Sequence, residues 1–344
     1  MSIRFFLVLI TLCSLLSVTG CAPKSPEMIA FSGPTMGTMY NVKFVLDDIQ
    51  AERINTEQID LEIKQSLQQI NNLMSTYIND SELSRLNKAP AGVPFRISAE
   101  TEFVLAAAIE LHHMSMGALD ITVGPLVNLW GFGPTMRPNK VPTNEDVEEV
   151  RQFVGLDKFQ LNDRAVIKSH PDVYIDLSTI AKGYAVDEIA ALLESYHITN
   201  YLVDIGGEMR ISGKKSEDKD WLIAIEKPVT NQRAAQVIIS IGDNAIATSG
   251  DYRNYFEKDG IRYSHLIDPS TAKPIQHNLA AVSVIHKSSM MADGLATALI
   301  VMGKEKGLAF AESENIPALF VVKEGEDFVE YHSTAFDKTV SVMH

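Results

Sequence analysis

The sequence has few cysteines and fewer basic than acidic residues. Its 344 residues include two cysteines, and 30 lysines and arginines stand against 44 aspartates and glutamates, a formal net charge of -14. No basic run could neutralise several phosphates, which excludes nucleic acid as a partner. With 46% apolar and 22% charged residues the chain is not disordered, and its length allows a sizeable core.

Long apolar runs are absent except at the N-terminus. Arg4 precedes fourteen uncharged, mostly apolar residues at 5–18, too short for a membrane span and typical of a secretory signal peptide. The run ends in Val18-Thr19-Gly20-Cys21, which resembles the bacterial lipobox. We therefore expect cleavage of residues 1–20 and acylation of Cys21, since two acyl chains hold a protein firmly at a membrane. The alternative is a cytosolic protein with an apolar N-terminal helix.

The predicted domain organisation follows from this N-terminus. Residues 21–31 would be the lipidated Cys21 and a short tether, and residues 32–344 one folded domain without an obvious internal boundary. Cys13 would leave with the signal peptide. The mature chain would then have no free thiol, which excludes disulfides, a cysteine nucleophile and cysteine-ligated metals.

Hydrophobic periodicity predicts an α+β fold. Helices are expected at 56–74, capped by Thr56, and at 98–116, with a polar loop or lobe junction at 133–144. A strand at 173–177, a helix at 179–196 and a strand at 201–205 would form one α/β unit. Further strands are predicted at 221–226, 237–241, 245–248, 263–267 and 281–286, followed by a helix at 292–302. Because no helices separate these strands, we expect a mostly antiparallel sheet with packed helices.

Several common active-site motifs fail on spacing. The glycines before Lys214 are too far apart for a phosphate loop, and Ser178 and Lys182 are one residue too far apart for the Ser-x-x-Lys of penicillin-binding proteins. The sequence has no Gly-x-Ser-x-Gly elbow and no His-Glu-x-x-His helix. Serine acyl transfer and zinc peptidase chemistry are therefore disfavoured.

Oxygen-bearing side chains suggest a cation site and a phosphate site. Asp293 and Thr297 are four residues apart in a predicted helix, so a carboxylate and a hydroxyl share one face, and such hard ligands suit Mg²⁺. Asp176 ends a predicted strand that leads into a helix N-terminus, where backbone amides favour a phosphate. For both segments plain helix capping is the alternative interpretation.

The segment Ser264-His265-Leu266-Ile267-Asp268-Pro269 suggests a proton acceptor. A histidine with a carboxylate three residues later can act as a general base near neutral pH. A structural histidine is the alternative. Gly206-Gly207 after the strand at 201–205 would allow another backbone or a ligand to approach closely, and a simple turn explains the pair equally well.

Taken together, these segments resemble the ApbE family, the FAD:protein FMN transferases, over nearly all of the chain after the tether. The resemblance is carried by motifs that occur in order along the sequence: Gly33-Pro34-Thr35-Met36-Gly37-Thr38, Ser75-Thr76-Tyr77 with Ser81 to Arg85, Gly117 to Leu126, Asp176 to Tyr184, Ile205 to Glu208, Thr248 to Arg253, Ser264 to Pro269, and Ala292 to Thr297. The family's two-lobed, T-fold-like architecture is then expected, with residues 32–344 as the flavin transferase domain.

The resemblance implies a set of site residues. FAD, the substrate, would be held by Met36, Tyr77, Ala118, Leu119, Asp120, Asp176, Lys182 and Ile267. Mg²⁺ would be held by Thr179, Asp293, the carbonyl of Ala296, and Thr297. Some relatives carry a carboxylate at position 296, where this chain has alanine. His265 would take the proton of the attacking hydroxyl, with Asp268 orienting it or serving as the base itself.

The implied reaction transfers the FMN moiety of FAD to a Thr or Ser hydroxyl of a target flavoprotein and releases AMP. Mg²⁺ would neutralise the charge that grows on the pyrophosphate. The implied clients are subunits of Nqr- and Rnf-type redox pumps. The alternatives are a periplasmic FAD pyrophosphatase and a lipoprotein that binds or scavenges FAD.

The expected location is the periplasmic face of the bacterial inner membrane, with Cys21 as the lipid anchor. The clients of the family favour this membrane. Residue 22 is alanine and no aspartate follows Cys21, which by the usual sorting rule points to the outer membrane instead. Both membranes therefore remain as alternatives.

Overall fold

The fold is built on one antiparallel sheet. The computed structural model describes residues 27–133, 141–216, 219–228, 235–252 and 254–343. Eight strands pair antiparallel throughout, each hydrogen-bonded to its neighbours. Their order across the sheet is β1 (Glu27–Thr35), β2 (Thr38–Leu46), β6 (Tyr201–Ile205), β7 (Glu208–Ser212), β12 (Ala245–Gly250), β17 (Leu279–His286), β18 (Ala318–Glu324) and β19 (Asp327–His332). The expected mostly antiparallel α+β fold is confirmed.

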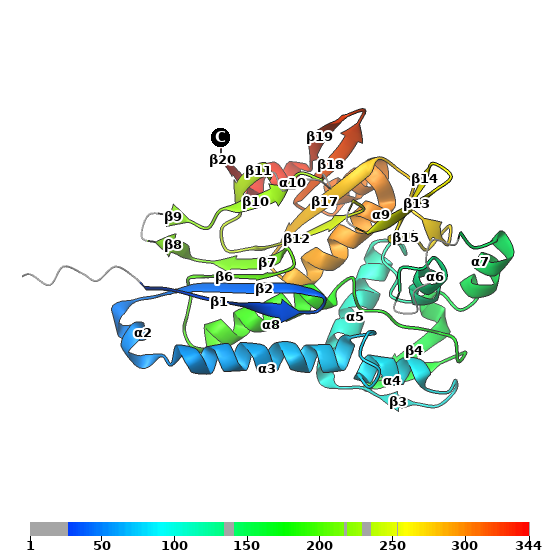
Figure 1. Ribbon diagram of the computed structural model, residues 1–344, viewed down its shortest axis with the longest axis horizontal. Coiled ribbons are helices and arrows are strands. Elements are labelled where there is room, and N and C mark those ends of the chain that lie inside the picture. Colours follow the sequence, from blue (N-terminus) through cyan, green and yellow to red (C-terminus); the bar gives the residue numbers. More distant parts are fainter. Residues whose placement is uncertain (1–26, 134–140, 217–218, 229–234, 253, 344) are drawn as a thin grey trace, which may run out of the picture.

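Long helices cover one face of this sheet and enclose the main core (Figure 1). They are α3 (Thr56–Met74), α5 (Ala99–Met114), α8 (Ala181–Ser195) and α9 (Ser289–Ser313). On α3 the apolar residues recur every three or four positions and are all buried, because that spacing places them on one face. Asn55 caps α3, one residue before the predicted cap.

A smaller layer covers the opposite face. It consists of β10 (Ile223–Glu226), β11 (Ala235–Ser240) and β20 (Ser341–Met343), with helix α10 (Thr334–Thr339) beside them. Ile223, Ile225 and Ile239 are buried against Ile246 and Leu319 of the central sheet. Alternation along these strands sends every second side chain into this second core.

The second lobe lies to the right in Figure 1 and is made of short elements. It contains α4 (Glu82–Lys88), β3 (Phe95–Arg96), α6 (Gly124–Leu129), α7 (Asn144–Arg151), η1 (Leu156–Lys158), β4 (Phe159–Asn162), β5 (Ala165–Lys168), β13 (Tyr255–Lys258), β14 (Ile261–Ser264), β15 (Ile267–Asp268) and β16 (Lys273–Pro274). The remaining elements are α2 (Asp48–Arg53), β8 (Lys214–Ser216) and β9 (Lys219–Asp220). Trp130 donates from its ring nitrogen to the carbonyl of Ala272 at 3.1 Å, which joins α6 to the β15–β16 hairpin.

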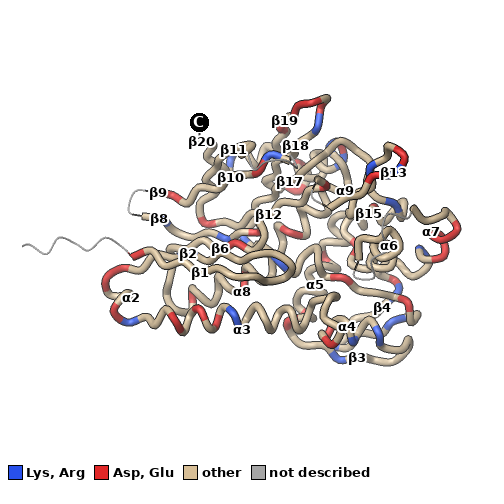
Figure 2. Tube along the Cα trace, viewed as in Figure 1, with Lys and Arg blue, Asp and Glu red and all other residues tan. Residues whose placement is uncertain are grey.

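Charged residues of both signs are dispersed along the chain. Acidic and basic positions are interspersed along the chain in Figure 2, for example on α3, where Lys64 pairs with Asp60 at 2.6 Å. None of the described helices is long and apolar enough to cross a membrane. The predicted signal peptide at 1–20 and Cys21 lie outside the described residues.

The structure corrects four details of the predicted organisation. Residues 173–177 form no strand, so the predicted α/β unit is absent. Their apolar side chains are buried, but the Asn87 side chain bonds both the amide and the carbonyl of Ile175 and so replaces a strand partner. Residues 27–31 belong to β1 and not to the tether. The strand predicted at 263–267 is divided between β14 and β15. The last predicted helix is longer, with a break at Gly303, where φ is 78°.

Candidate active site

A cavity of about 800 Å³ opens where the central sheet divides. β7 pairs with β12 only through Met209 and Arg210. Beyond this point β12 continues to Gly250, while the chain of β7 turns back at Gly206 and Gly207. The cavity therefore has strand ends on one side, and residues of the second lobe and of β10 line the others.

Ten of the fourteen predicted site residues line this cavity: Tyr77, Ala118, Asp120, Asp176, Thr179, Lys182, His265, Ile267, Asp293 and Thr297. The other four do not. Leu119 and Ala296 are buried in the core, and Met36 packs against the core from the β1–β2 turn. Asp268 accepts from the amide and the hydroxyl of Ser270. Its carboxylate therefore closes a turn, and the predicted pairing of Asp268 with His265 is not made in this structure.

Three charged side chains meet at the floor of the cavity. Lys182 from α8 forms an ion pair with Glu208 from β7, and Asp293 from α9 lies beside them. Burial raises the pKa of Asp293 to about 7; the charge of Lys182 opposes this rise and the charge of Glu208 adds to it. Burial also raises the pKa of Glu208 despite Lys182. Within the described residues, the carboxyl groups of Glu208 and Asp293 therefore both lie beside the ammonium group of Lys182.

A close approach of two helices holds Asp293 in place. The amide of Gly183 on α8 donates to Oδ2 of Asp293 at 3.0 Å. A Cβ atom at position 183 would lie 2.3 Å from the carbonyl oxygen of Ser289, so only glycine permits this crossing. Ser288 caps α9. The alternative that Asp293 merely caps its helix is therefore wrong.

Hydroxyl groups complete an oxygen-rich cluster. Thr297 lies one turn after Asp293 and shares a hydrogen bond of 3.2 Å with Ser249. Oγ1 of Thr179 is buried without a hydrogen-bond partner, which costs free energy unless a ligand satisfies it. In the described part of the chain no three His, Cys, Asp or Glu side chains form a metal cluster. One carboxylate with threonine hydroxyls nevertheless fits the preference of Mg²⁺ for hard oxygen ligands.

His265 stands at the side of the cavity near the second lobe. Its Nδ1 lies 3.0 Å from the carbonyl oxygen of Asn254, which can only accept, so Nδ1 carries the proton and Nε2 can accept one. Burial lowers the pKa of His265, and the charge of Lys182 lowers it further, while the bond to Asn254 opposes the shift. The imidazole is therefore neutral at pH 7 and suited to act as a base.

Sequence reasoning missed Glu208 and Ser249. Glu208 belongs to one of the quoted motifs and Ser249 to another, but neither was given a role. A single acidic residue after two glycines carries no signal of its own. What marks Glu208 is tertiary, because it is 3% exposed and its Oε2 has no hydrogen-bond partner.

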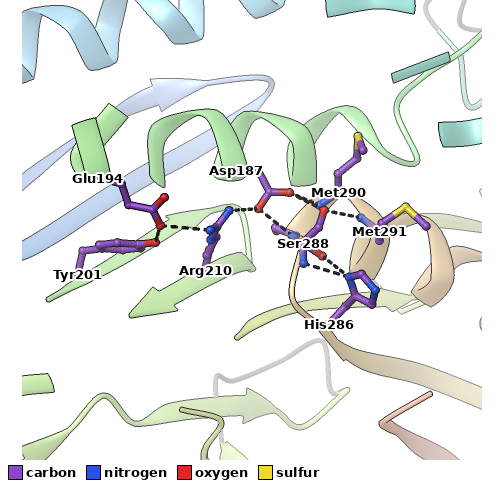
Figure 3. Close-up of polar contacts among 9 residues, drawn as sticks. Asp187, Glu194, Tyr201, Arg210, His286, Ser288, Met290 and Met291 are labelled. Atoms are coloured by element: carbon purple, nitrogen blue, oxygen red, sulfur yellow. Dashed lines mark hydrogen bonds and ion pairs between the residues drawn. The ribbon is translucent and has the colours of Figure 1, made fainter. Parts of the chain in front are cut away.

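A polar network fixes the helix that carries Asp293 (Figure 3). Asp187 on α8 accepts from Oγ of Ser288 at 2.7 Å and from the amides of Ser289 and Met290, both at 3.0 Å. Arg210 on β7 bridges Asp187 and Glu194. The first turn of α9 is therefore tied to α8 and to the central sheet.

Replacing Asp187 with alanine is expected to lower the free energy of unfolding by about 2 kcal/mol, because two helix-terminal amides and Arg210 lose their acceptor. Urea unfolding followed by circular dichroism measures this loss. Asp47, which caps the exposed helix α2, is the matched control. Equal effects of the alanine variants at the two positions would contradict the assigned role of Asp187.

Sequence and structure comparisons agree on the family. A model of the ApbE family matches residues 36–320. The FAD:protein FMN transferases of Vibrio cholerae and Haemophilus influenzae are 49% and 47% identical, and the matches cover 97% and 94% of this chain and 98% and 94% of theirs. The crystal structure of the Pseudomonas stutzeri flavinyl transferase ApbE matches with a TM-score of 0.85 at 42% identity, over 92% of this chain and 98% of that one. The chain belongs to the ApbE family.

Proposed function

We propose that this protein is a Mg²⁺-dependent FAD:protein FMN transferase, which moves the FMN moiety of FAD onto a Thr or Ser hydroxyl of another protein. The names of the relatives support the transferase activity. The observation that carries the proposal is the cluster of Lys182, Glu208 and Asp293 in a cavity that is also lined by Thr179, whose hydroxyl is buried without a hydrogen-bond partner. Such a cluster suits a polyanionic substrate held through a cation.

The chain's own groups have distinct roles in this reaction. Thr179, Asp293 and Thr297 would hold Mg²⁺, which when bound neutralises charge on the pyrophosphate. Lys182 supplies a further positive charge at the floor of the cavity. The exposed ring of Tyr77 and the apolar side chains of Val127 and Ile267 offer a surface for a flavin or adenine ring.

The transfer step balances without a further reactant. The acceptor oxygen forms a bond to the phosphorus of the FMN moiety, and the bond from that phosphorus to the bridging oxygen breaks. AMP leaves with that bonding pair. Nε2 of His265 takes the proton of the hydroxyl, because it can accept a proton at neutral pH.

A covalent labelling assay tests the proposed function. The soluble chain from residue 22 onward is mixed with FAD, Mg²⁺ and a purified acceptor subunit, and denaturing gels are read by flavin fluorescence. We expect a fluorescent acceptor band that EDTA and a Thr→Ala change at the acceptor position both abolish. AMP release without a band would instead indicate FAD hydrolysis, and bound FAD without turnover would indicate a carrier.

A change of His265 to glutamine is expected to lower kcat/KM about 100-fold, because proton removal from the hydroxyl loses its acceptor. Since the pKa of His265 is lowered, the wild-type rate should fall only below pH 6.5 as the imidazole is protonated, and the variant should lose this dependence. Rates of labelling between pH 5 and 8 measure both effects. The exposed His197 is the control position. An unchanged pH profile in the variant would remove His265 as the base.

The proposed location and clients rest on the N-terminal sequence and the family. Cys21 would carry the lipid that anchors the protein to the periplasmic face of the inner membrane, beside subunits of Nqr- or Rnf-type redox pumps. Separation of inner and outer membranes, followed by detection of the protein in each fraction, tests this placement. Recovery in the outer membrane would contradict it.

A further inference from the structure

The cavity extends from the buried cluster to an open strand edge. Four consecutive residues of β10, Ile223 to Glu226, border the cavity. The side chains of Ile223 and Ile225 are buried in the second core, whereas Ala224 is exposed. Because side chains alternate along a strand and yet all four residues border the cavity, it is the main-chain edge of β10 that faces the cavity.

This edge is available for pairing. β10 is the terminal strand of its sheet, with β11 on its other side, and within the described ranges no strand pairs with the edge that faces the cavity. An edge strand presents unpaired N–H and C=O groups, and an extended peptide can add to them as a further strand. The edge of Ile223 to Ile225 therefore provides a template for a short extended segment.

The central sheet completes this part of the cavity. Met39 and Asn41 of β2 and Asp204 of β6 border the same cavity, and Asn41 donates to Asp204 at 3.2 Å. Asp204 also accepts from the amide of Gly207 at 2.9 Å, which fixes the β6–β7 turn next to Glu208. A segment lying here would lead directly toward the cluster of Lys182 and Glu208.

The acceptor must enter this cavity as a narrow segment. Asp293 is 4% exposed and Thr297 is 8% exposed. An attacking oxygen must come within about 3.5 Å of the phosphorus, and a threonine hydroxyl is separated from its backbone by a single carbon. A threonine on a flat protein surface could not reach such a buried position, so the client backbone has to pass into the cavity.

We propose that the client's acceptor segment binds as an extended strand along the edge formed by Ile223 to Ile225 of β10, and that its Thr or Ser hydroxyl reaches the Lys182–Glu208–Asp293 cluster from there. The inference rests on the proposed function and names the partner surface of the same site. Pairing would involve about three client residues, since the template from Ile223 to Ile225 is three residues long.

A bulky side chain at position 224, on the strand that carries the edge, tests the proposal. The probe is a fluorescein-labelled synthetic peptide that spans the acceptor threonine of a purified Nqr-type subunit, and its binding to the soluble chain from residue 22 onward is followed by anisotropy. We expect Ala224→Trp to weaken binding at least tenfold and to raise the KM for the acceptor subunit at least tenfold, while the KM for FAD changes less than twofold.

The matched control is Ile238→Trp. Ile238 is the cross-strand neighbour of Ala224 on β11, is 40% exposed and does not border the cavity. Its variant should bind the peptide like the wild type. Equal peptide binding by the wild type and the Ala224→Trp variant, or an equal rise in the KM for FAD, would overturn the proposal.

Main-chain pairing has its own test. A series of peptides is made in which one residue at a time is N-methylated. If the peptide binds as an added strand, N-methylation at every second position near the threonine should abolish binding, and N-methylation at the positions between should not affect it. Uniform tolerance would overturn the strand geometry. Because peptide binding needs no FAD turnover, failure of the wild type to label the acceptor would count against the proposed function alone, and peptide binding would still decide the inference.

Discussion

Replacing Asp293 with alanine is expected to lower both AMP release and acceptor labelling roughly 100-fold or more, because the cluster loses its only carboxylate on α9 that could hold Mg²⁺. Steady-state rates at saturating FAD measure the effect. Calorimetric titration with Mg²⁺ should show weaker binding to the variant, and removal of Mg²⁺ by EDTA should reduce the wild type to the level of the variant.

The fold should survive this change. Asp293 accepts a hydrogen bond from the amide of Gly183, and the loss of this bond should change the free energy of unfolding by about 1 kcal/mol. Glu305→Ala on the exposed side of the same helix is the control and should keep full activity. If Asp293→Ala released AMP at the wild-type rate and only bound FAD less tightly, the metal role would be wrong and a carrier function would be favoured.

Replacing Lys182 with methionine is expected to lower the free energy of unfolding by about 3 kcal/mol, because Glu208 remains buried without its counter-charge. Urea unfolding measures the loss. The matched control is Lys64→Met, which breaks the exposed pair with Asp60 and should leave stability nearly unchanged.

A double variant separates stability from catalysis. Adding Glu208→Gln to Lys182→Met removes the uncompensated charge and should restore most of the lost stability, because a neutral side chain of the same shape then fills the site. Activity should remain low, since the positive charge at the cavity floor is still missing. If the second change destabilised the protein further, the ion pair would not be the source of the first effect.

Local patterns predicted the parts of the fold that depend on neighbouring residues. The apolar spacing of 56–74 predicted α3 with its cap one residue too late, and the run at 201–205 predicted β6, because periodicity alone decides which face of such a segment is buried. The same rule failed at 173–177. There the side chains are buried as in a strand, but Asn87, 88 residues earlier in the chain, takes the place of the strand partner.

The candidate site, too, was predictable from the sequence only in part. Ordered motifs indicated the ApbE family and ten residues that the structure brings to one cavity. They could not indicate that Asp268 turns toward Ser270, nor that Leu119 is buried in the core. The direction of a side chain depends on the turn or helix face that carries it, and residue identity does not state it.

By itself the sequence determined the family, the antiparallel α+β class and the oxygen-rich character of the site, because these follow from residue type and short-range spacing. Only the tertiary structure decided which groups share the cavity floor. Lys182 and Glu208 are 26 residues apart, and Gly183 and Asp293 are 110 apart. The burial of Glu208 and Asp293, the raised pKa values of these two carboxyl groups and the open edge of Ile223 to Ile225 arise from contacts between distant segments, which no local pattern encodes.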